Sequence, residues 1–308
     1  TLGDRVASAQ LALGLLAIAL LLFGLERIRS RGELALAQDA NRSRWPRMHL
    51  RGARAVAAFT ACALPVLLGA VVPVVMLVSL ARGSEQNWLS DRYIGFFTNS
   101  LILAGFAAII TLTAAILLST NRRMGQSGRS KAAVEIARMG YAVPGGVIAI
   151  GLFVPVAGFD NALDAWTRAN MGFSTGLLFS GSIALLILAY MIRVLAAALG
   201  AWRAGEVTLT RDLDRAAFGL GANTITVLRR IHIPVLRPAA LTAMLLVFVD
   251  TIKELPATLI IRPFGWDTLA VQAYRLAADE RLEGAAVPSL VIVAIGLVPV
   301  IILCRRMN

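Results

Sequence analysis

Three ionisable side chains, Asp250, Lys253 and Glu254, interrupt a long apolar run of this 308-residue chain. On a helix Asp250 would share a face with both others, so Lys253 could neutralise one carboxylate and leave about one net negative charge. Charged groups at membrane depth are costly, and therefore face a cavity or one another. They could line or gate a path for polar cargo, relay a coupling ion, or form a structural ion cluster between helices.

Two prolines accompany these charges. Pro256 follows Glu254 closely, and Pro144 precedes Gly145 and Gly146 in another apolar run. Proline bends a helix, and lipid tolerates the break only where protein or a water-filled cavity repairs the hydrogen bonding. We therefore assign both prolines to the candidate path, although ordinary proline usage in membrane helices stays open, and Pro256 could instead end its helix early near the outer interface. Arg193 is expected near the cytoplasmic end of its span, where snorkelling explains it.

A second pattern, RAAFGLGANTITVLRRIHIP, occupies residues 215–234. Its fixed positions are Ala216, Ala217, Gly221, Ile231, Ile233 and Pro234. The pattern predicts a helix over 212–220 with Thr210 as N-cap, and a turn at Gly221 with positive φ. A second helix over 222–233 should then be stopped by Pro234. Small alanines allow close approach to a groove, so this basic elbow is typical of a docking element.

Catalytic and metal-binding residues are not predicted. The sequence contains no GxxxxGK[ST] loop that would cradle ATP phosphates, and its histidines, His49 and His232, have no metal-site spacing with cysteine or carboxylate. The two cysteines, Cys62 and Cys304, lie inside apolar runs and suggest no disulfide. We therefore expect neither an enzyme nor a bound cofactor or metal in this chain.

Composition indicates an all-α polytopic membrane protein. The chain is 58% apolar and only 16% charged, against about 25% charged residues in soluble domains. Runs of roughly 20 apolar residues are long enough to cross a bilayer as helices. Seven spans are predicted, at residues 6–25, 55–80, 98–120, 134–157, 175–200, 239–261 and 286–304.

The net charge of +12 sorts by loop, which favours membrane topology over nucleic-acid binding. Twenty arginines and lysines fall in the connections 26–54, 121–133 and 201–238 and in the C-terminal tail, whereas the opposite connections, 81–97, 158–174 and 262–285, hold six. Because basic residues stay inside, the C-terminus and the 201–238 loop are predicted to be cytoplasmic.

The elbow resembles the signature loop of binding-protein-dependent ABC transporter permeases, in which EAA, three residues, Gly, nine residues and I-x-L-P follow one another. Arg215 stands at the position of the motif Glu, preceded by Asp214, and Ile233 stands for the Leu. The segments YAVPGG, FVDTIKELPATLIIRPFGWDTLAV and RLEGAAVPSL are similar to those of the iron(III)-type subfamily. The resemblance covers nearly the whole chain.

The resemblance implies the type I ABC importer permease fold. Residues 1–25 would be the last helix of a preceding permease unit, 26–54 a basic cytoplasmic linker, and 55–308 a six-helix permease domain. Asp214, Arg215 and the pattern residues of the elbow would contact a cytoplasmic ATPase dimer that binds ATP with Mg²⁺. A periplasmic or surface-anchored binding protein would deliver cargo, and a first permease half, on the same polypeptide or as a second copy, would complete the path in the bacterial inner membrane.

Ferric iron is the favoured cargo on this resemblance, and thiamine, polyamine, sulfate and phosphonate remain alternatives. A different class, an ion-coupled secondary transporter, would use Asp250, Lys253 and Glu254 as a relay without ATPase subunits. A scaffold or intramembrane enzyme is a further rival, but an enzyme would need a nucleophile and base paired within a span, and none is found.

Overall fold

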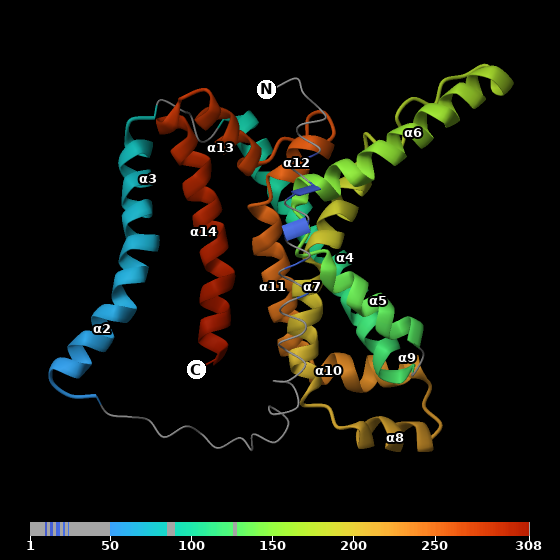
Figure 1. Ribbon diagram of the computed structural model, residues 1–308, viewed down its shortest axis with the longest axis horizontal. Helices are drawn as coiled ribbons and strands as arrows, with labels where there is room; N and C mark the ends of the chain where they lie inside the picture. Colours follow the sequence, from blue (N-terminus) through green and yellow to red (C-terminus); the bar gives the residue numbers. More distant parts are fainter. Residues whose placement is uncertain are drawn as a thin grey trace.

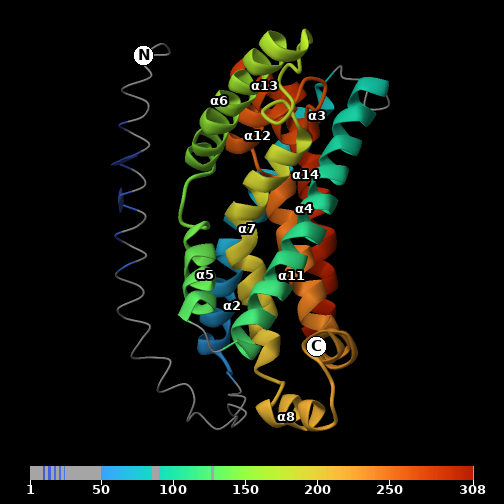
Figure 2. The ribbon, with the colours of Figure 1, turned by 90° about the vertical axis from the view of Figure 1, so that its right-hand side faces the viewer.

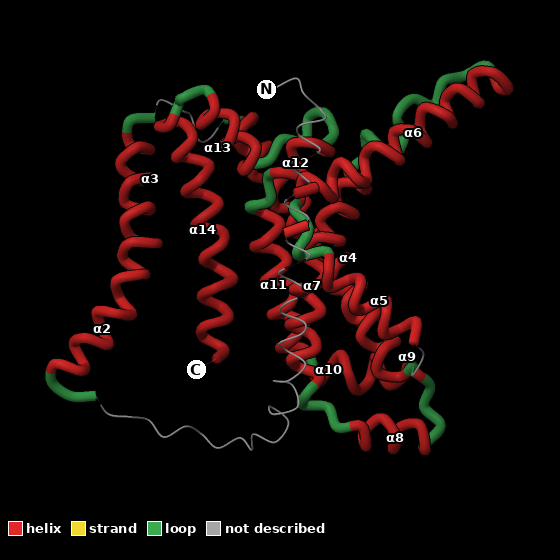
Figure 3. Tube along the Cα trace, viewed as in Figure 1, coloured by secondary structure: helices red, strands yellow, loops and turns green. Residues whose placement is uncertain are grey.

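The computed structural model describes residues 50–84, 90–125 and 128–307, together with isolated positions before residue 25. The predicted first span, 6–25, and the linker up to residue 49 lie outside this description, apart from those positions. In the described part every regular element is a helix (Figure 3). The elements are α2 Ala53–Val66, η1 Leu67–Val71, α3 Val72–Arg82, α4 Asp91–Met124, α5 Gly128–Met139, α6 Gly145–Met171, α7 Ile183–Glu206, α8 Arg211–Gly219, α9 Thr224–Val227, η2 Leu228–His232, α10 Ile233–Val235, α11 Arg237–Ile252, α12 Pro256–Ile261, α13 Leu269–Ala278 and α14 Leu282–Met307.

Several of these helices have the length and apolar composition of membrane spans. Five qualify alone: Ala53–Arg82, Asp91–Met124, Gly145–Met171, Ile183–Glu206 and Leu282–Arg305. A sixth is obtained if Thr224–Val235 and Arg237–Ile252, bent by 78°, count as one span. The described chain is therefore a multi-pass helical membrane protein, in agreement with the predicted class.

The bounds predicted for the fourth and fifth spans are wrong. α5 ends at Met139 and α6 begins only at Gly145, so a break falls inside the expected span 134–157. Pro144 causes part of this break, because a proline disfavours helical geometry in the residue before it. α6 then continues through most of the predicted outer connection, and the next helix begins at Ile183 instead of residue 175.

The sixth predicted span, 239–261, is also broken. α11 ends at Ile252 and α12 begins at Pro256, so that Lys253 and Glu254 lie between the two helices. Pro256 suits the first position of a helix, where a missing N–H removes no hydrogen bond. The early helix end that the sequence left open is therefore present, and the charged residues lie at a break.

Each π-helical segment ends shortly before a proline. η1 ends two residues before Pro73, and η2 ends two residues before Pro234. In a π turn an N–H bonds the carbonyl five residues back, as Ile233 does to Leu228. The wider turn relieves the clash between a proline ring and the carbonyl four residues earlier. This explains how α2, η1 and α3 continue as one span.

The core forms where α4, α7 and α11 pack together. Small buried residues on these helices, Ala108, Ala115, Ala198 and Ala243, let the backbones approach closely. α14 lies between α3 and α11 (Figure 1). The span formed by α2 and α3 buries none of its apolar window, so it can face lipid or another membrane unit.

The C-terminal half of α6 leaves the bundle as an arm (Figure 1). Two carboxylates on α6 hold the segment that returns along it. Asp160, fully buried, accepts hydrogen bonds from the N–H of Phe179 and from the N–H and hydroxyl of Ser180. Asp164 accepts one from the hydroxyl of Ser174 at 2.6 Å. The bonds to Asp160 satisfy the buried N–H of Ser180 and the partly buried N–H of Phe179, which the loop would otherwise leave unpaired.

Gly140, in the break between α5 and α6, offers a test of the packing against α7. A Cβ added there would collide with the backbone carbonyl oxygen of Ile192, which cannot rotate away. We expect Gly140→Ala to destabilise the protein by about 1–3 kcal/mol, as overpacking does. Gly151→Ala, in open space on α6, is the matched control and should change little. Equal midpoints of thermal unfolding in detergent for the two variants would contradict the close approach.

Candidate functional site: a coupling elbow and a polar pocket

The elbow, residues 211–235, consists of α8 and the helix formed by α9, η2 and α10, which meet at a tight turn. The N–H of Gly221 bonds the carbonyl of Phe218 at 3.0 Å, and the N–H of Ala222 bonds that of Ala217 at 3.0 Å. This pair of bonds is a Schellman motif, which needs a left-handed residue after the helix. Gly221 has φ 82°, so the positive φ predicted for it is confirmed.

Two other predictions for the elbow concern the N-cap of α8 and the end of the second helix. Thr210 occupies the N-cap position of α8, but its side chain makes no capping hydrogen bond. The second helix begins after Asn223, whose side chain accepts a bond from the N–H of Thr226 at 2.8 Å. It runs to Val235, so the prediction that Pro234 stops it is wrong, because the π turn of η2 accommodates the proline.

The outer surface of the elbow is exposed. Arg215, at the position of the motif Glu, pairs with the exposed Asp212 at 3.2 Å. Ala216 is exposed and Ala217 half-buried. Leu220, at the tip, is 90% exposed. The elbow lies at the end of the molecule opposite α12 and α13, where a soluble partner can reach it (Figures 1 and 2).

Asp214 differs from its neighbours because it is buried. Its Oδ2 lies 2.7 Å from Nε of Arg123, and its Oδ1 lies 2.8 Å from Nε2 of His232. Burial opposes ionisation, but the hydrogen bonds from His232 and Arg123 and the charge of Arg123 outweigh it and hold the pKa of Asp214 below its ordinary value. Asp214 is therefore ionised at neutral pH. Because an ionised carboxylate only accepts hydrogen bonds, Nε2 of His232 carries the hydrogen.

A polar pocket of about 390 Å³ lies where the two helix breaks meet. It is lined by Tyr141, Arg193, Val194, Asp250, Lys253, Glu254, Leu255 and Pro256. Four of the five predicted path residues line it, and Pro144 does not. Pro144 is the N-cap of α6, next to Gly145, where an added Cβ would press on the side chains of Arg193 and Glu254.

Glu254 is the most buried charge of this pocket, with its side chain 2% exposed. Its carboxylate lies 3.6 Å from a guanidinium nitrogen of Arg193. It also accepts hydrogen bonds from the N–H groups of Ala257 at 3.1 Å and Thr258 at 3.3 Å, in the first turn of α12. The carboxylate therefore joins α7 to the start of α12 and satisfies backbone donors that the break exposes.

The placement predicted for Arg193 is wrong. It lies near the middle of α7 and reaches the pocket, so snorkelling to the cytoplasmic surface does not explain it. The expected net negative charge is wrong for the same reason. Lys253 pairs with Asp250 at 2.9 Å, and Arg193 pairs with Glu254, so the two ion pairs leave the pocket with no net charge.

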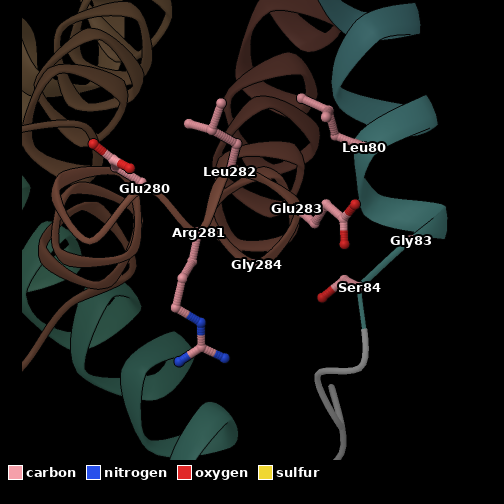
Figure 4. A pocket seen from close by; sticks show the side chains of 8 residues that line it. All are labelled: Leu80, Gly83, Ser84, Glu280, Arg281, Leu282, Glu283 and Gly284. Carbon is pink, nitrogen blue, oxygen red and sulfur yellow. The ribbon is translucent and has the colours of Figure 1, made fainter.

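A further pocket, of about 750 Å³, opens between the C-terminal end of α3 and the N-terminal end of α14 (Figure 4). Glu280, Arg281 and Glu283 contribute its charged groups, and the carboxylate of Glu283 faces Gly83. Glu280 has φ 59°, which is uncommon for a residue other than glycine. The RLEGAAVPSL segment that forms part of this pocket has no periodicity or residue spacing that predicts a pocket.

Metal-binding groups are lacking in the part of the chain that the structure describes. No three His, Cys, Asp or Glu side chains there are placed to hold an ion. Cys62 and Cys304 are both exposed and form no disulfide.

Two groups of relatives match this chain, although no protein-family model does. The Fe(3+)-transport system permease protein FbpB 2 of Haemophilus influenzae is 28% identical over 243 residues, which are 77% of this chain and 44% of the relative. The putative 2-aminoethylphosphonate transport system permease protein PhnV of Salmonella typhimurium is 30% identical over 128 residues, 41% of this chain and 48% of the relative. The chain thus spans less than half the length of either relative.

Solved structures show the same fold at low sequence identity. A chain of a bacterial alginate ABC transporter, in complex with an alginate pentasaccharide-bound periplasmic protein, matches with a TM-score of 0.63. The identity is 17%, and the match covers 81% of this chain and 92% of that one. A second structure, of a bacterial ABC transporter for alginate import, gives 0.62 at 15% identity. This chain is therefore homologous to the permease proteins of ABC transport systems and has the fold of an ABC importer permease.

Proposed function

We propose that this chain is the second half of the membrane-spanning permease of an ABC importer. Residues 55–308 form the six-helix unit, 26–54 the linker, and 1–25 the last helix of a first unit. The 44% of the Haemophilus relative that is covered is close to the share that one unit of a two-unit permease would cover. The unburied apolar face of α2 and α3 provides surface for lipid and for the first half.

The elbow carries this proposal. It presents an exposed α8, a glycine turn and the protruding Leu220, and the turn geometry fixes one helix against the other. An ATPase dimer that binds ATP with Mg²⁺ docks on this surface, and its closure moves the elbow. The elbow and the C-terminus lie at one end of the molecule (Figure 1). The excess of basic residues in the connections at this end favours a cytoplasmic location for it, with the protein in the bacterial inner membrane.

The polar pocket is the portion of the cargo path that this half supplies. Its charges are paired, so it offers contacts that are transient, as a path requires. Ferric iron, delivered by a periplasmic or surface-anchored binding protein, is the favoured cargo because the match to an iron(III) permease covers 77% of this chain, against 41% for PhnV. A phosphonate is the second candidate, favoured by the match to PhnV.

A cross-linking and uptake experiment tests the proposal. Leu220→Cys, in a background with Cys62→Ser and Cys304→Ser, is expressed with the first permease half and the ATPase subunits. We expect Leu220→Cys to cross-link to the ATPase, and intact cells to accumulate radioactive Fe(III) only when the ATPase is active. ATPase-dependent accumulation of radioactive 2-aminoethylphosphonate without accumulation of Fe(III) would identify phosphonate as the cargo instead.

The main rival is an ion-coupled secondary transporter. It would accumulate cargo in response to an ion gradient when the ATPase subunits are deleted, and Leu220→Cys would find no partner. The paired carboxylates of the pocket speak against this rival, because each already has a cation beside it and neither is left to carry a coupling ion. Gradient-driven uptake without the ATPase would nevertheless overturn the proposed function.

A further inference from the structure

The attachment of α8 to the membrane helices depends on a charged group. Asp214 is the one buried residue among the nine of α8, so apolar packing does not hold this helix in place. Its carboxylate reaches Arg123, near the end of α4, and His232, in η2. We call these three residues the brace. Apart from the backbone connections of α8, the brace is the route by which a motion of this helix can reach α4.

Arg123 makes the brace stiff. Besides its 2.7 Å bond to Asp214, its guanidinium donates to the carbonyl oxygens of Leu209 at 3.0 Å and Thr210 at 3.2 Å, and more weakly to that of Glu206 at 3.4 Å. These carbonyls belong to the end of α7 and the connection to α8. The planar fork of arginine fixes the direction of each bond, which a lysine in its place could not do.

His232 ties the second helix of the elbow to the same carboxylate. Its side chain is fully buried, and Nε2 donates to Asp214 at 2.8 Å. Breaking such a buried network leaves uncompensated polar groups, so the elbow and the end of α4 are held as one body. Arg215, one residue away, takes no part because its side chain is exposed and points to Asp212.

α4 connects the brace to the opposite end of the molecule. It has 34 residues, and a helix of that length spans about 50 Å. About two turns inside its N-terminal end, Asn99 donates to the carbonyl oxygens of Gly265 at 3.3 Å and Asp267 at 3.2 Å, and Ser100 accepts the N–H of Leu269 at 2.9 Å. One helix is therefore tied by hydrogen bonds to the elbow near its C-terminal end, and to the loop before α13 and the first residue of α13 in its N-terminal part.

We propose that α4 is a rod that transmits motion of the elbow to the outer loop 262–268, and that Asp214 is the positioning residue at its cytoplasmic joint. This inference rests on the proposed function, because an ATPase must move the elbow. Between its ends α4 packs along α7 and α11, and these contacts oppose bending of the helix. The outer loop is thereby opened or closed in step with the nucleotide state.

Movement of the outer loop can be measured directly. Phe264, in that loop, is fully exposed, and Phe264→Cys in the Cys62→Ser, Cys304→Ser background can be labelled with a membrane-impermeant maleimide. In the assembled complex, trapping with ATP and vanadate should change the labelling rate at least about threefold, within the range that coupling networks produce. Asp214→Asn should abolish this change and lower uptake per ATP hydrolysed about tenfold, while ATP hydrolysis persists.

Two matched variants separate transmission from folding and docking. Glu135→Gln removes a carboxylate of α5 that pairs with Arg138, outside both the brace and the elbow, so uptake per ATP hydrolysed should stay the same. Asn99→Ala combined with Ser100→Ala removes all the hydrogen bonds of the other joint of α4 and should uncouple as Asp214→Asn does, even if Asp214→Asn fails to fold.

The outcomes distinguish the inference from the function on which it rests. Nucleotide-dependent labelling in both Asp214→Asn and the combined Asn99→Ala, Ser100→Ala variant, with normal uptake per ATP, would overturn the rod while leaving the importer intact. A wild-type chain that neither binds the ATPase nor imports cargo would overturn the proposed function, and this inference with it.

Discussion

Replacing Gly221 with valine should reduce ATP-driven import at least about tenfold, because a β-branched residue in a left-handed conformation costs more than the roughly 1–2 kcal/mol of an ordinary one. The glycine has φ 82° and closes the Schellman motif at the end of α8. A residue that does not adopt the left-handed conformation changes the turn and so shifts the second helix relative to α8. The docking surface then no longer has a single shape for the ATPase.

The expected loss comes from the backbone and not from crowding. A Cβ added at Gly221 meets no atom within 4 Å, and the same is true at Gly219, two residues earlier in α8. Gly219→Val, which adds the same side chain at a helical φ, is therefore the matched control. Gly221→Asn should be intermediate, because asparagine tolerates the left-handed region better than other residues.

Uptake of Fe(III) and the amount of ATPase that co-purifies are the measurements for this series. Immunoblotting of membranes should show equal insertion of all three variants, because the turn lies outside the spans. The order should be Gly219→Val closest to wild type, then Gly221→Asn, then Gly221→Val. Equal import by the two valine variants would show that the conformation of the turn does not govern docking.

The elbow turn could be predicted from the sequence because its causes are local. A helix with acidic residues in its first turn, two small residues and a glycine at the right offset suffice to specify a helix, a left-handed turn and a second helix. The presence of a membrane span is also determined locally, since the mean hydropathy over about 20 residues indicates it. Both signals lie within a single stretch of chain and need no knowledge of distant contacts.

The helix breaks and the pairings across them could not be predicted in this way. A hydropathy window averages over five residues such as 140–144, so apolar runs on both sides merge into one span. Pro144 and Pro256 indicated where breaks could lie, but prolines also occur within continuous helices, as Pro155 does in α6. Whether a proline ends a helix depends on what repairs the lost hydrogen bond.

Charge pairing is non-local for the same reason. Arg193 and Glu254 lie on different helices, and only their packing shows that the pocket is neutral. Likewise, nothing in the sequence signals that Asp214 turns inward to Arg123 while Arg215 faces outward. Adjacent residues on a helix point in directions that differ by about 100°, so the motif alone did not assign the inward carboxylate.

Glu254→Ala should destabilise the protein by about 3 kcal/mol, near the lower end of the range for removing one partner of a buried ion pair. The variant leaves Arg193 without a counter-charge and leaves the N–H groups of Ala257 and Thr258 unpaired. The lower end applies because the Arg193 side chain remains 34% exposed and retains part of its hydration. The midpoint of thermal unfolding in detergent measures the effect.

Two further variants assign the loss to the buried charge. Arg193→Met combined with Glu254→Ala should recover part of the stability, because the double variant no longer buries an unpaired cation. Lys253→Met removes half of the more exposed pair with Asp250, whose lysine is 60% exposed, and should cost about 0–1 kcal/mol. If Glu254→Ala lowered the midpoint no more than Lys253→Met, the carboxylate would not be holding the break. In that case α12 would be stabilised by its apolar contacts with α6 and α7, and Glu254 would be free to act on cargo.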